Sequence, residues 1–307
     1  MFCSAYGLSV NYEKVLRNTD CQKIWTRCKS VCKFLAKRFI KFYANYWPIF
    51  VVFVSLGVFV FGRTLNDAYG EAVNIPKRLL YDFIGIQGFN SYNITWWFNK
   101  LIIILYLIFP LVHWLCNRKS WILMLLLSFG LLFYTDELNY GFIPNICMYL
   151  FPFVLGIVCA IKGNAISNMI STKGHNRWLI FIGVILCVIL CTVIRVKEII
   201  PHFDGIRVDG LLTLSLVSLI VIVRKILNYQ FRILPFIGKY SATMYLTHTF
   251  FMLYWFPSFF LSANHPVCSV LGLFVVSLVT AMLLEYMKHK TLYNKLTYIL
   301  VEEIEKL

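Results

Sequence analysis

Residues 238–256, GKYSATMYLTHTFFMLYWF, are the stretch from which the rest of the chain can be interpreted. They are numerous enough to cross most of the hydrocarbon core of a bilayer, which takes about 20 apolar residues. Five side chains follow at spacings of 4, 3, 4 and 3 and so share one helical face: Ser241, Tyr245, His248, Met252 and Trp255. Three of the five can form hydrogen bonds. We therefore expect this face to pack against protein or a water-filled cavity and not against lipid.

His248 is the ionisable residue of this face. An ionisable side chain at membrane depth is a candidate for a working role. The alternative is a neutral imidazole whose hydrogen bonds are satisfied by a neighbouring helix. The sequence leaves both interpretations open.

The composition is that of a polytopic membrane protein. Of the 307 residues, 60% are hydrophobic and only 14% are charged, whereas soluble domains carry about 25% charged residues. We expect an all-α fold, a polytopic transmembrane helix bundle of about eight spans in a single membrane-embedded domain, residues 1–307. The apolar runs that predict the spans are 46–62, 101–116, 121–134, 143–161, 178–194, 208–223, 240–257 and 266–287.

The charge pattern predicts the orientation. If the basic segment 11–45 lies inside and the spans alternate, 22 of the 29 lysines and arginines fall inside and 7 fall outside. Cytoplasmic loops carry such an excess, so both termini are expected to be cytoplasmic. Residues 288–307 are predicted to form an amphipathic tail on the inner surface. The net charge of +15 in such a protein is explained first by its orientation in the membrane and by contact with anionic membrane lipids. No nucleic acid is expected as a partner.

The longest outer connection, 63–96, is rich in aromatic residues, carboxylates and amides. These include Tyr69, Tyr81, Tyr92, Trp96 and Trp97 beside Asn90 and Asn93. Such a set resembles a carbohydrate-facing surface. An interfacial aromatic belt is the alternative.

The cysteines predict no metal site. Cys28 and Cys32 are four residues apart, as are Cys187 and Cys191, but neither pair has a second pair or a histidine at metal-ligand spacing. No cleavable signal peptide is expected in the first ten residues, which are too few for a hydrophobic signal core.

Four stretches, in order along the chain, resemble the membrane acyltransferase-3 family. Residues 238–251 are similar to its late Gly-Lys-x-Ser turn and Tyr-Leu-x-His span, and residues 1–10, MFCSAYGLSV, to the end of its second span, Phe-Phe-x-x-Ser-Gly-Tyr. Residues 33–48, KFLAKRFIKFYANYWP, resemble the basic stretch and proline before its third span. Residues 93–112, NITWWFNKLIIILYLIFPLV, resemble its fourth span.

The chain departs from the family pattern in three ways. Family members usually have about ten spans, whereas eight are predicted here, and the missing portion is the first two. That portion carries the family's proposed catalytic histidine, and no histidine precedes His113 in this chain. The chain is therefore expected to lack the family's N-terminal portion and to be inactive as given. The family's Arg-x-x-Arg appears as Arg38 and Lys41, which keeps the charge but loses one bidentate fork. Ala5 stands where the family has glycine.

The resemblance implies transfer of an acyl group, often acetyl, from cytoplasmic acyl-CoA to a sugar hydroxyl of an outer-face glycan. It implies a multi-pass protein of the bacterial cytoplasmic (inner) membrane, with acyl-CoA as donor substrate and no bound cofactor. The phosphates of CoA need a cationic vestibule, for which the motif suggests Arg38, Lys41 and Lys37, followed by Lys239 and Arg232. Positive-inside topology alone is the other explanation for these cations.

The resemblance also suggests supporting roles for His248, Ser241 and Tyr245, which would orient the reactants or line the acyl path. The resemblance assigns the role of general base to the family's catalytic histidine, which this chain lacks. Three other functions stay open: a glycan transporter or flippase, an O-antigen-type polymerase and an inactive remnant. A transporter would favour inverted repeats and broken helices, and a polymerase would favour larger outer loops with arginines.

Overall fold

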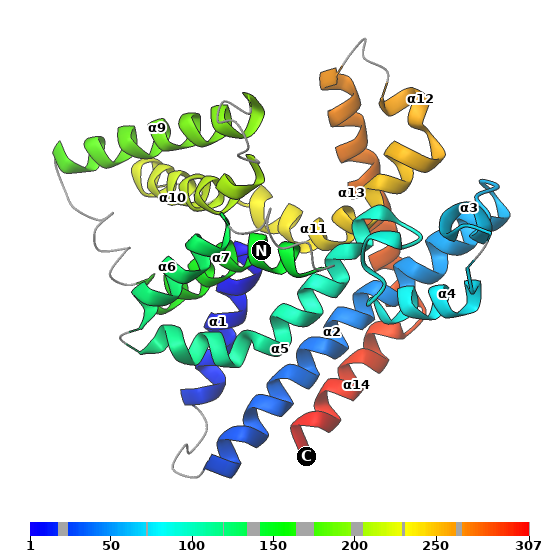
Figure 1. The fold of residues 1–307 in the computed structure, drawn as a ribbon, viewed down its shortest axis with the longest axis horizontal. Helices are drawn as coiled ribbons and strands as arrows, with labels where there is room; N and C mark the ends of the chain where they lie inside the picture. Colours follow the sequence, from blue (N-terminus) through cyan, green and yellow to red (C-terminus); the bar gives the residue numbers. More distant parts are fainter. Residues whose placement is uncertain are drawn as a thin grey trace. The chain divides into compact units, whose positions relative to one another are not determined.

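The computed structural model describes residues 1–17, 24–71, 73–118, 120–133, 142–163, 175–197, 205–228, 231–261 and 266–306, and every regular element within these ranges is helical (Figure 1). The all-α prediction is confirmed. The α-helices are α1 (Phe2–Arg17), α2 (Ile24–Phe59), α3 (Leu65–Tyr69), α4 (Ile75–Ile84), α5 (Trp97–Asn117), α6 (Trp121–Leu131), α7 (Ile143–Ile161), α9 (His175–Lys197), α10 (Asp209–Leu227), α11 (Ile233–Thr249), α12 (Pro257–Phe260), α13 (Pro266–Lys290) and α14 (Tyr293–Lys306). Three 3-10 turns, η1 (Gly88–Asn90), η2 (Ile94–Trp96) and η3 (Gly205–Val208), and a π-helical segment, η4 (Phe250–Trp255), complete the described elements.

Six helices in the described ranges are long and apolar enough to cross a membrane, and each overlaps a predicted span: residues 25–59, 94–117, 143–161, 178–196, 209–227 and 266–290. The other two predicted spans are helical but differ from expectation. The predicted span 121–134 contains the 11-residue α6. The predicted span 240–257 begins earlier, at Ile233, and changes from α-helix to π-helix at Phe250. The outer acids Asp136, Glu137, Glu198 and Asp204 lie outside the described residues.

In its described residues, 11–17 and 24–45, the basic segment is helical. Its second half belongs to α2, which has 36 residues and is therefore roughly 54 Å long at 1.5 Å per residue. A hydrocarbon core of about 30 Å takes only about 20 of these residues. All the lysines and arginines of α2 precede Phe42, so the basic half of the helix extends beyond the apolar half.

The chain divides into two compact units, each made from two separate stretches. Unit 1 comprises residues 1–31 and 107–231, and unit 2 comprises residues 32–106 and 232–307, so the division falls within α2 and α5. In unit 1, α1 packs against α7, where a Cβ on Gly156 would collide with the backbone oxygen of Phe2. The apolar core of this unit contains Phe2, Leu132, Phe151, Leu155 and Cys159.

Unit 2 is built on α2 and α11, which run parallel. About midway along both helices, the Thr243 hydroxyl donates to Asn45 Oδ1 over 3.2 Å. Further along both helices, the rings of Phe53 and Phe250 have centroids 4.8 Å apart. Since the later residue of one helix meets the later residue of the other, the basic start of α2 and the start of α11 share one end of this unit.

The outer connection of unit 2 folds back on these helices. Tyr92 and Trp96 are 0% and 1% exposed and belong to the core that contains Phe53 and Phe250. The expectation that the aromatics of 63–96 form a carbohydrate-facing surface or an interfacial belt is therefore wrong for these two, because burial of their rings anchors the connection. Tyr69, Tyr81 and Trp97 are half-buried, and Asn90 is exposed.

Gly57 is required where the connection meets α2. A Cβ at this buried position would overlap the Tyr92 hydroxyl, which donates to the Arg63 carbonyl over 2.9 Å. We expect Gly57→Ala to lower the free energy of unfolding by about 1–3 kcal/mol, as overpacking does. The measurement is thermal or denaturant unfolding of the purified protein in detergent.

Two variants test the cause. Tyr92→Phe in the Gly57→Ala background removes the colliding oxygen and should recover part of the loss. Gly183→Ala, in α9, adds a Cβ that would meet no atom within 4 Å, and it should be neutral or slightly stabilising because alanine favours helix. Equal losses at Gly57 and Gly183 would contradict the proposed close contact.

Candidate functional site

The candidate site is organised around the carbonyl oxygen of Leu246 in α11. It accepts side-chain hydrogen bonds from Asn93 Nδ2 (3.3 Å) and Trp96 Nε1 (3.2 Å), both from the outer connection. These bonds lie where the backbone hydrogen-bond pattern changes from that of the α-helix α11 to that of the π-helix η4. A π-helical turn in an α-helix leaves carbonyls available to other donors and is frequent at functional sites.

Asn93 joins the two segments with its other amide atom. Its Oδ1 accepts from the Thr249 hydroxyl over 2.6 Å and from the backbone and hydroxyl of Thr95 at 3.0 Å each. Asn93 is 0% exposed. Both polar atoms of this buried amide have partners, so it holds the Leu246 carbonyl before His248 and the Thr249 side chain after it.

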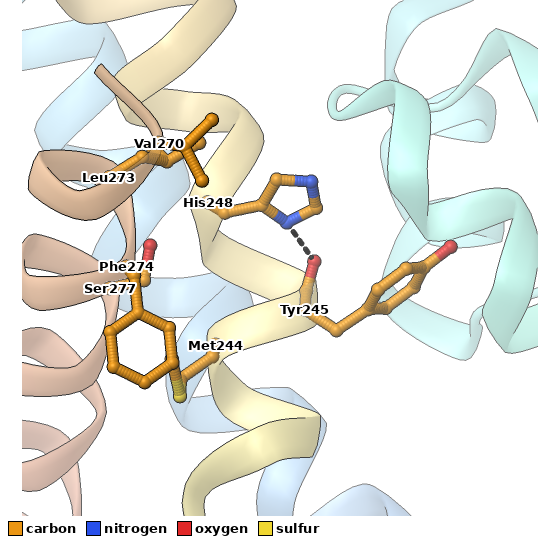
Figure 2. Close-up of a pocket in the computed structure, with 7 residues that line it drawn as sticks. All are labelled: Met244, Tyr245, His248, Val270, Leu273, Phe274 and Ser277. Carbon is orange, nitrogen blue, oxygen red and sulfur yellow. Dashed lines mark hydrogen bonds between the residues drawn. The ribbon is translucent and has the colours of Figure 1, made fainter. Parts of the chain in front are cut away.

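His248 is oriented by its own helix. Its Nδ1 lies 2.8 Å from the Tyr245 carbonyl oxygen (Figure 2). Because a carbonyl oxygen can only accept, Nδ1 carries the hydrogen, and Nε2 of the neutral ring is left as an acceptor. A hydrogen bond to a backbone carbonyl is a common way to select the tautomer of a working histidine.

His248 lines a pocket of about 250 Å³ between α11 and α13. Figure 2 shows His248 and Met244 on α11 opposite Leu273, Phe274 and Ser277 on α13, with Val270 and Tyr245 completing the lining. The histidine is half-buried. The pocket is mainly apolar.

The face predicted from the spacing of 4, 3, 4 and 3 is not the buried face of α11. Thr243, Leu246 and Thr247 are buried instead, whereas Ser241 is exposed and Tyr245 is half-buried. Ser241 donates to the Gly238 carbonyl at 2.9 Å, and the Tyr245 ring lies 4.9 Å from that of Phe98. The predicted pattern fails beyond Thr249, because the π-helical turn shifts Met252 and Trp255 around the axis.

The candidate cations of α2 differ in what they contact. Lys37 pairs with the Glu305 carboxylate of α14, and Lys33 donates to the Glu305 backbone oxygen over 3.0 Å. Arg38 is half-buried, with its guanidinium over the Phe34 ring at 5.1 Å, and no ion pair to it is found among the described residues. Lys41 is exposed. Of the three candidate cations on this helix, Arg38 and Lys41 are therefore the ones that an anion can reach, because Lys37 is already paired.

The cations of α11 lie at the same end of unit 2. Arg232 and Lys239 are exposed residues at the start of the helix. A third cation, Lys288 of α13, was missed by the sequence analysis because it was assigned to the tail. Its ammonium contacts Glu285 at 2.5 Å and Asn45 Oδ1 at 3.2 Å, so it joins α13 to α2.

The predicted tail forms α14, which lies beside α2 in Figure 1. Its half-buried positions include Tyr293, Thr297, Val301 and Ile304, which follow at spacings of 4, 4 and 3 and so share one face of the helix. The Lys37 ammonium holds the pKa of the Glu305 carboxyl below its usual value.

The outer connection of unit 2 contains a buried carboxyl group near Tyr46 of α2. Asp82, 1% exposed, accepts hydrogen bonds at Oδ2 from the Tyr69 hydroxyl and the Tyr92 amide, each at 2.5 Å. Burial raises the pKa of Asp82 to about 6, and these hydrogen bonds oppose the rise. Burial and the neighbouring Asp82 raise the pKa of Tyr69 as well.

The other described buried histidine, His113, lies in unit 1. Its ring packs edge-on against Tyr12 with centroids 4.9 Å apart, and its Nε2 lies 3.2 Å from Glu13. Among the described residues, no group of three His, Cys, Asp or Glu side chains could hold a metal ion.

Comparison with protein families gives one match. A family model described as an acyltransferase domain, of the acyltransferase-3 type, covers residues 1–286 and so extends through both units and ends before α14. No curated protein and no solved structure matches the chain.

The raised pKa of Asp82 predicts a pH-dependent stability. Because the pKa is higher in the folded state than its ordinary 3.8, the stabilising effect of the proton is complete below about pH 4 and is lost as the pH rises through about 6. Asp82 is then expected to contribute at most about 3 kcal/mol to this loss. Thermal unfolding at pH 5 and pH 7 should show a larger loss of stability in the wild type than in Asp82→Asn. The same pH dependence in both proteins would contradict the assignment to Asp82.

Proposed function

Because the chain belongs to membrane acyltransferase family 3, we propose that it moves an acyl group, in the simplest case acetyl, from acyl-CoA to a sugar hydroxyl of a cell-surface or exported glycan. The proposed location is the bacterial cytoplasmic membrane, with the donor on the cytoplasmic side and the acceptor on the outer side. The match supports a membrane acyltransferase, while donor, acyl group and acceptor are our proposal.

One observation carries the proposal: the parallel course of α2 and α11 puts accessible cations at one end of unit 2 and His248 further along. The hydrogen bond between Thr243 and Asn45 shows that these two residues lie at the same height along α11 and α2. Arg38 precedes Asn45 by seven residues, or roughly 10 Å of helix. His248 follows Lys239 by nine residues, or roughly 13 Å. An extended pantetheine arm can reach from phosphates bound at these cations to a thioester beside His248.

Arg38 is the cation best suited to the phosphates of CoA. A half-buried guanidinium that pairs with no carboxylate in the described ranges keeps its planar set of donors for an incoming anion, and a bidentate Arg–phosphate pair is among the strongest charge-assisted hydrogen bonds. Lys41, one helical turn later, and Lys239 and Arg232, at the start of α11, add long-range attraction. Lys37 would first have to leave Glu305.

The chemistry is a transfer from a thioester to an oxygen ester. The hydroxyl oxygen of the sugar attacks the acyl carbon, the carbon–sulfur bond breaks, and the hydroxyl proton ends on the CoA thiol. His248 supports this step through Nε2, which can accept a hydrogen bond from the hydroxyl and orient it. Tyr245 holds the imidazole by its backbone carbonyl, and Ser241 lies two turns closer to the cationic end.

The proposal predicts that Arg38→Ala weakens binding of acyl-CoA about ten- to a hundredfold, the loss expected for a charge-assisted hydrogen bond of about 1.5–3 kcal/mol. Arg38→Lys should recover only part of the affinity because lysine lacks the fork. Isothermal titration of the purified full chain with acetyl-CoA measures the effect.

Arg118→Ala is the matched control. Arg118 is exposed and its guanidinium stacks on Trp114 at 4.2 Å, so it contributes positive charge without belonging to the proposed vestibule. Its loss should change the affinity less than twofold. Equal losses for the two variants would leave only the topological explanation for Arg38.

A further inference from the structure

The pocket beside His248 contains a second polar group, Ser277 of α13. Ser277 is 2% exposed, and its hydroxyl has no hydrogen-bond partner among the described residues. Ser277 and His248 come from different helices and line the same pocket (Figure 2).

The unpaired hydroxyl of Ser277 indicates a ligand at this position. Hydroxyls buried in helices usually donate to a carbonyl of the preceding turn, as Thr247 does to Thr243 at 2.9 Å and Ser215 does to Leu211 at 2.8 Å. Ser277 makes no such bond within the described part of the chain. A buried hydroxyl without a hydrogen-bond partner destabilises the fold, and a ligand that brings an acceptor oxygen would offset this cost.

The size and lining of the pocket restrict the ligand. Its volume of about 250 Å³ is below the roughly 300–1,000 Å³ of pockets that enclose drug-sized ligands. The nucleotide of CoA would not fit. The wall formed by Met244, Val270, Leu273 and Phe274 is apolar and suits a short hydrocarbon chain.

We infer that this pocket binds the acyl group of the donor and selects its chain length. The Ser277 hydroxyl donates to the carbonyl oxygen of the thioester, and the apolar wall encloses the carbons beyond it. The bond both holds the thioester in the pocket that His248 lines and withdraws electrons from the acyl carbon. This inference rests on the proposed acyl transfer and adds to it the residues that determine which acyl group is used.

The test compares acyl donors of increasing length in the full chain. Transfer from acetyl-, butanoyl- and hexanoyl-CoA to a glycan acceptor is measured as kcat/KM for the wild type, Ser277→Leu and Phe274→Ala. Ser277→Leu fills the pocket and should reduce the use of hexanoyl-CoA at least tenfold more than that of acetyl-CoA. Phe274→Ala enlarges the pocket and should shift the preference by a similar factor toward hexanoyl-CoA.

A conservative variant isolates the hydroxyl. Ser277→Ala should lower kcat/KM about tenfold for all three donors and leave their ratios unchanged, because only the bond to the carbonyl is lost. Ser269→Ala, a half-buried serine of α13 outside the pocket lining, should change neither the rate nor the ratios. Phe274 is 40% exposed, so its variant keeps the test decisive if Ser277→Leu fails to fold.

The outcomes separate this inference from the proposed function. Transfer by the wild type with the same chain-length ratios in Ser277→Leu and Phe274→Ala would overturn the acyl pocket and leave acyl transfer intact. Acyl-CoA-dependent transfer absent from the wild type for every donor would overturn both, and it would agree with the expectation from the missing family histidine that residues 1–307 are inactive.

Discussion

The two hydrogen bonds to the Leu246 carbonyl are the interaction on which unit 2 depends. A helix in an apolar environment has no water to satisfy a carbonyl that leaves the regular ladder, so a change to π-helix must be met by protein donors. Asn93 and Trp96 supply them. The same contact ties the outer connection to α11, buries Tyr92 and Trp96 in the core, and fixes the backbone that bears His248. The position of the candidate site therefore follows from satisfying one backbone oxygen.

This arrangement separates two chemical environments along parallel helices. The cations of α2 and α11 gather before Asn45 and Thr243, while the start of the outer connection, where Tyr92 donates to the Arg63 carbonyl, lies beyond Phe53 and Phe250. The buried Asp82 lies nearer the middle of α2, since its backbone carbonyl accepts from Tyr46. Positive charge favours the cytoplasmic side of a membrane, and it also suits the phosphates of CoA. His248 lies between the two environments, beside an apolar pocket whose Ser277 hydroxyl lacks a partner in the part of the chain that the structure describes. One helix pair can thus serve a donor from one side and an acceptor from the other.

Features that depend on composition and local motifs could be predicted from the sequence, whereas contacts that depend on tertiary packing could not. Six of the eight spans predicted from hydropathy correspond to helices long and apolar enough to cross a membrane. Four motifs indicated a family that the match to residues 1–286 confirms. The regular period of 3.6 residues could not predict the π-helical turn at Phe250, so Met252 and Trp255 do not continue the face of His248. Asn93 and Trp96 were interpreted as surface residues because their partner lies about 150 residues away in the chain. The adjacent amide and tryptophan before an apolar run were the available signal. The roles of His248, Ser241, Tyr245 and the five cations stay predictions.

The central claim is that the cationic start of α11 and the carboxylate-rich outer connection face opposite sides of the membrane, with His248 between them. Labelling of single cysteines by an impermeant maleimide in sealed, right-side-out vesicles tests it most directly, in a background without the native cysteines. Asp67→Cys in α3, which is exposed, should react from outside, whereas Lys239→Cys should react only after the vesicles are permeabilised. Reaction of both cysteines from the same side would contradict the account.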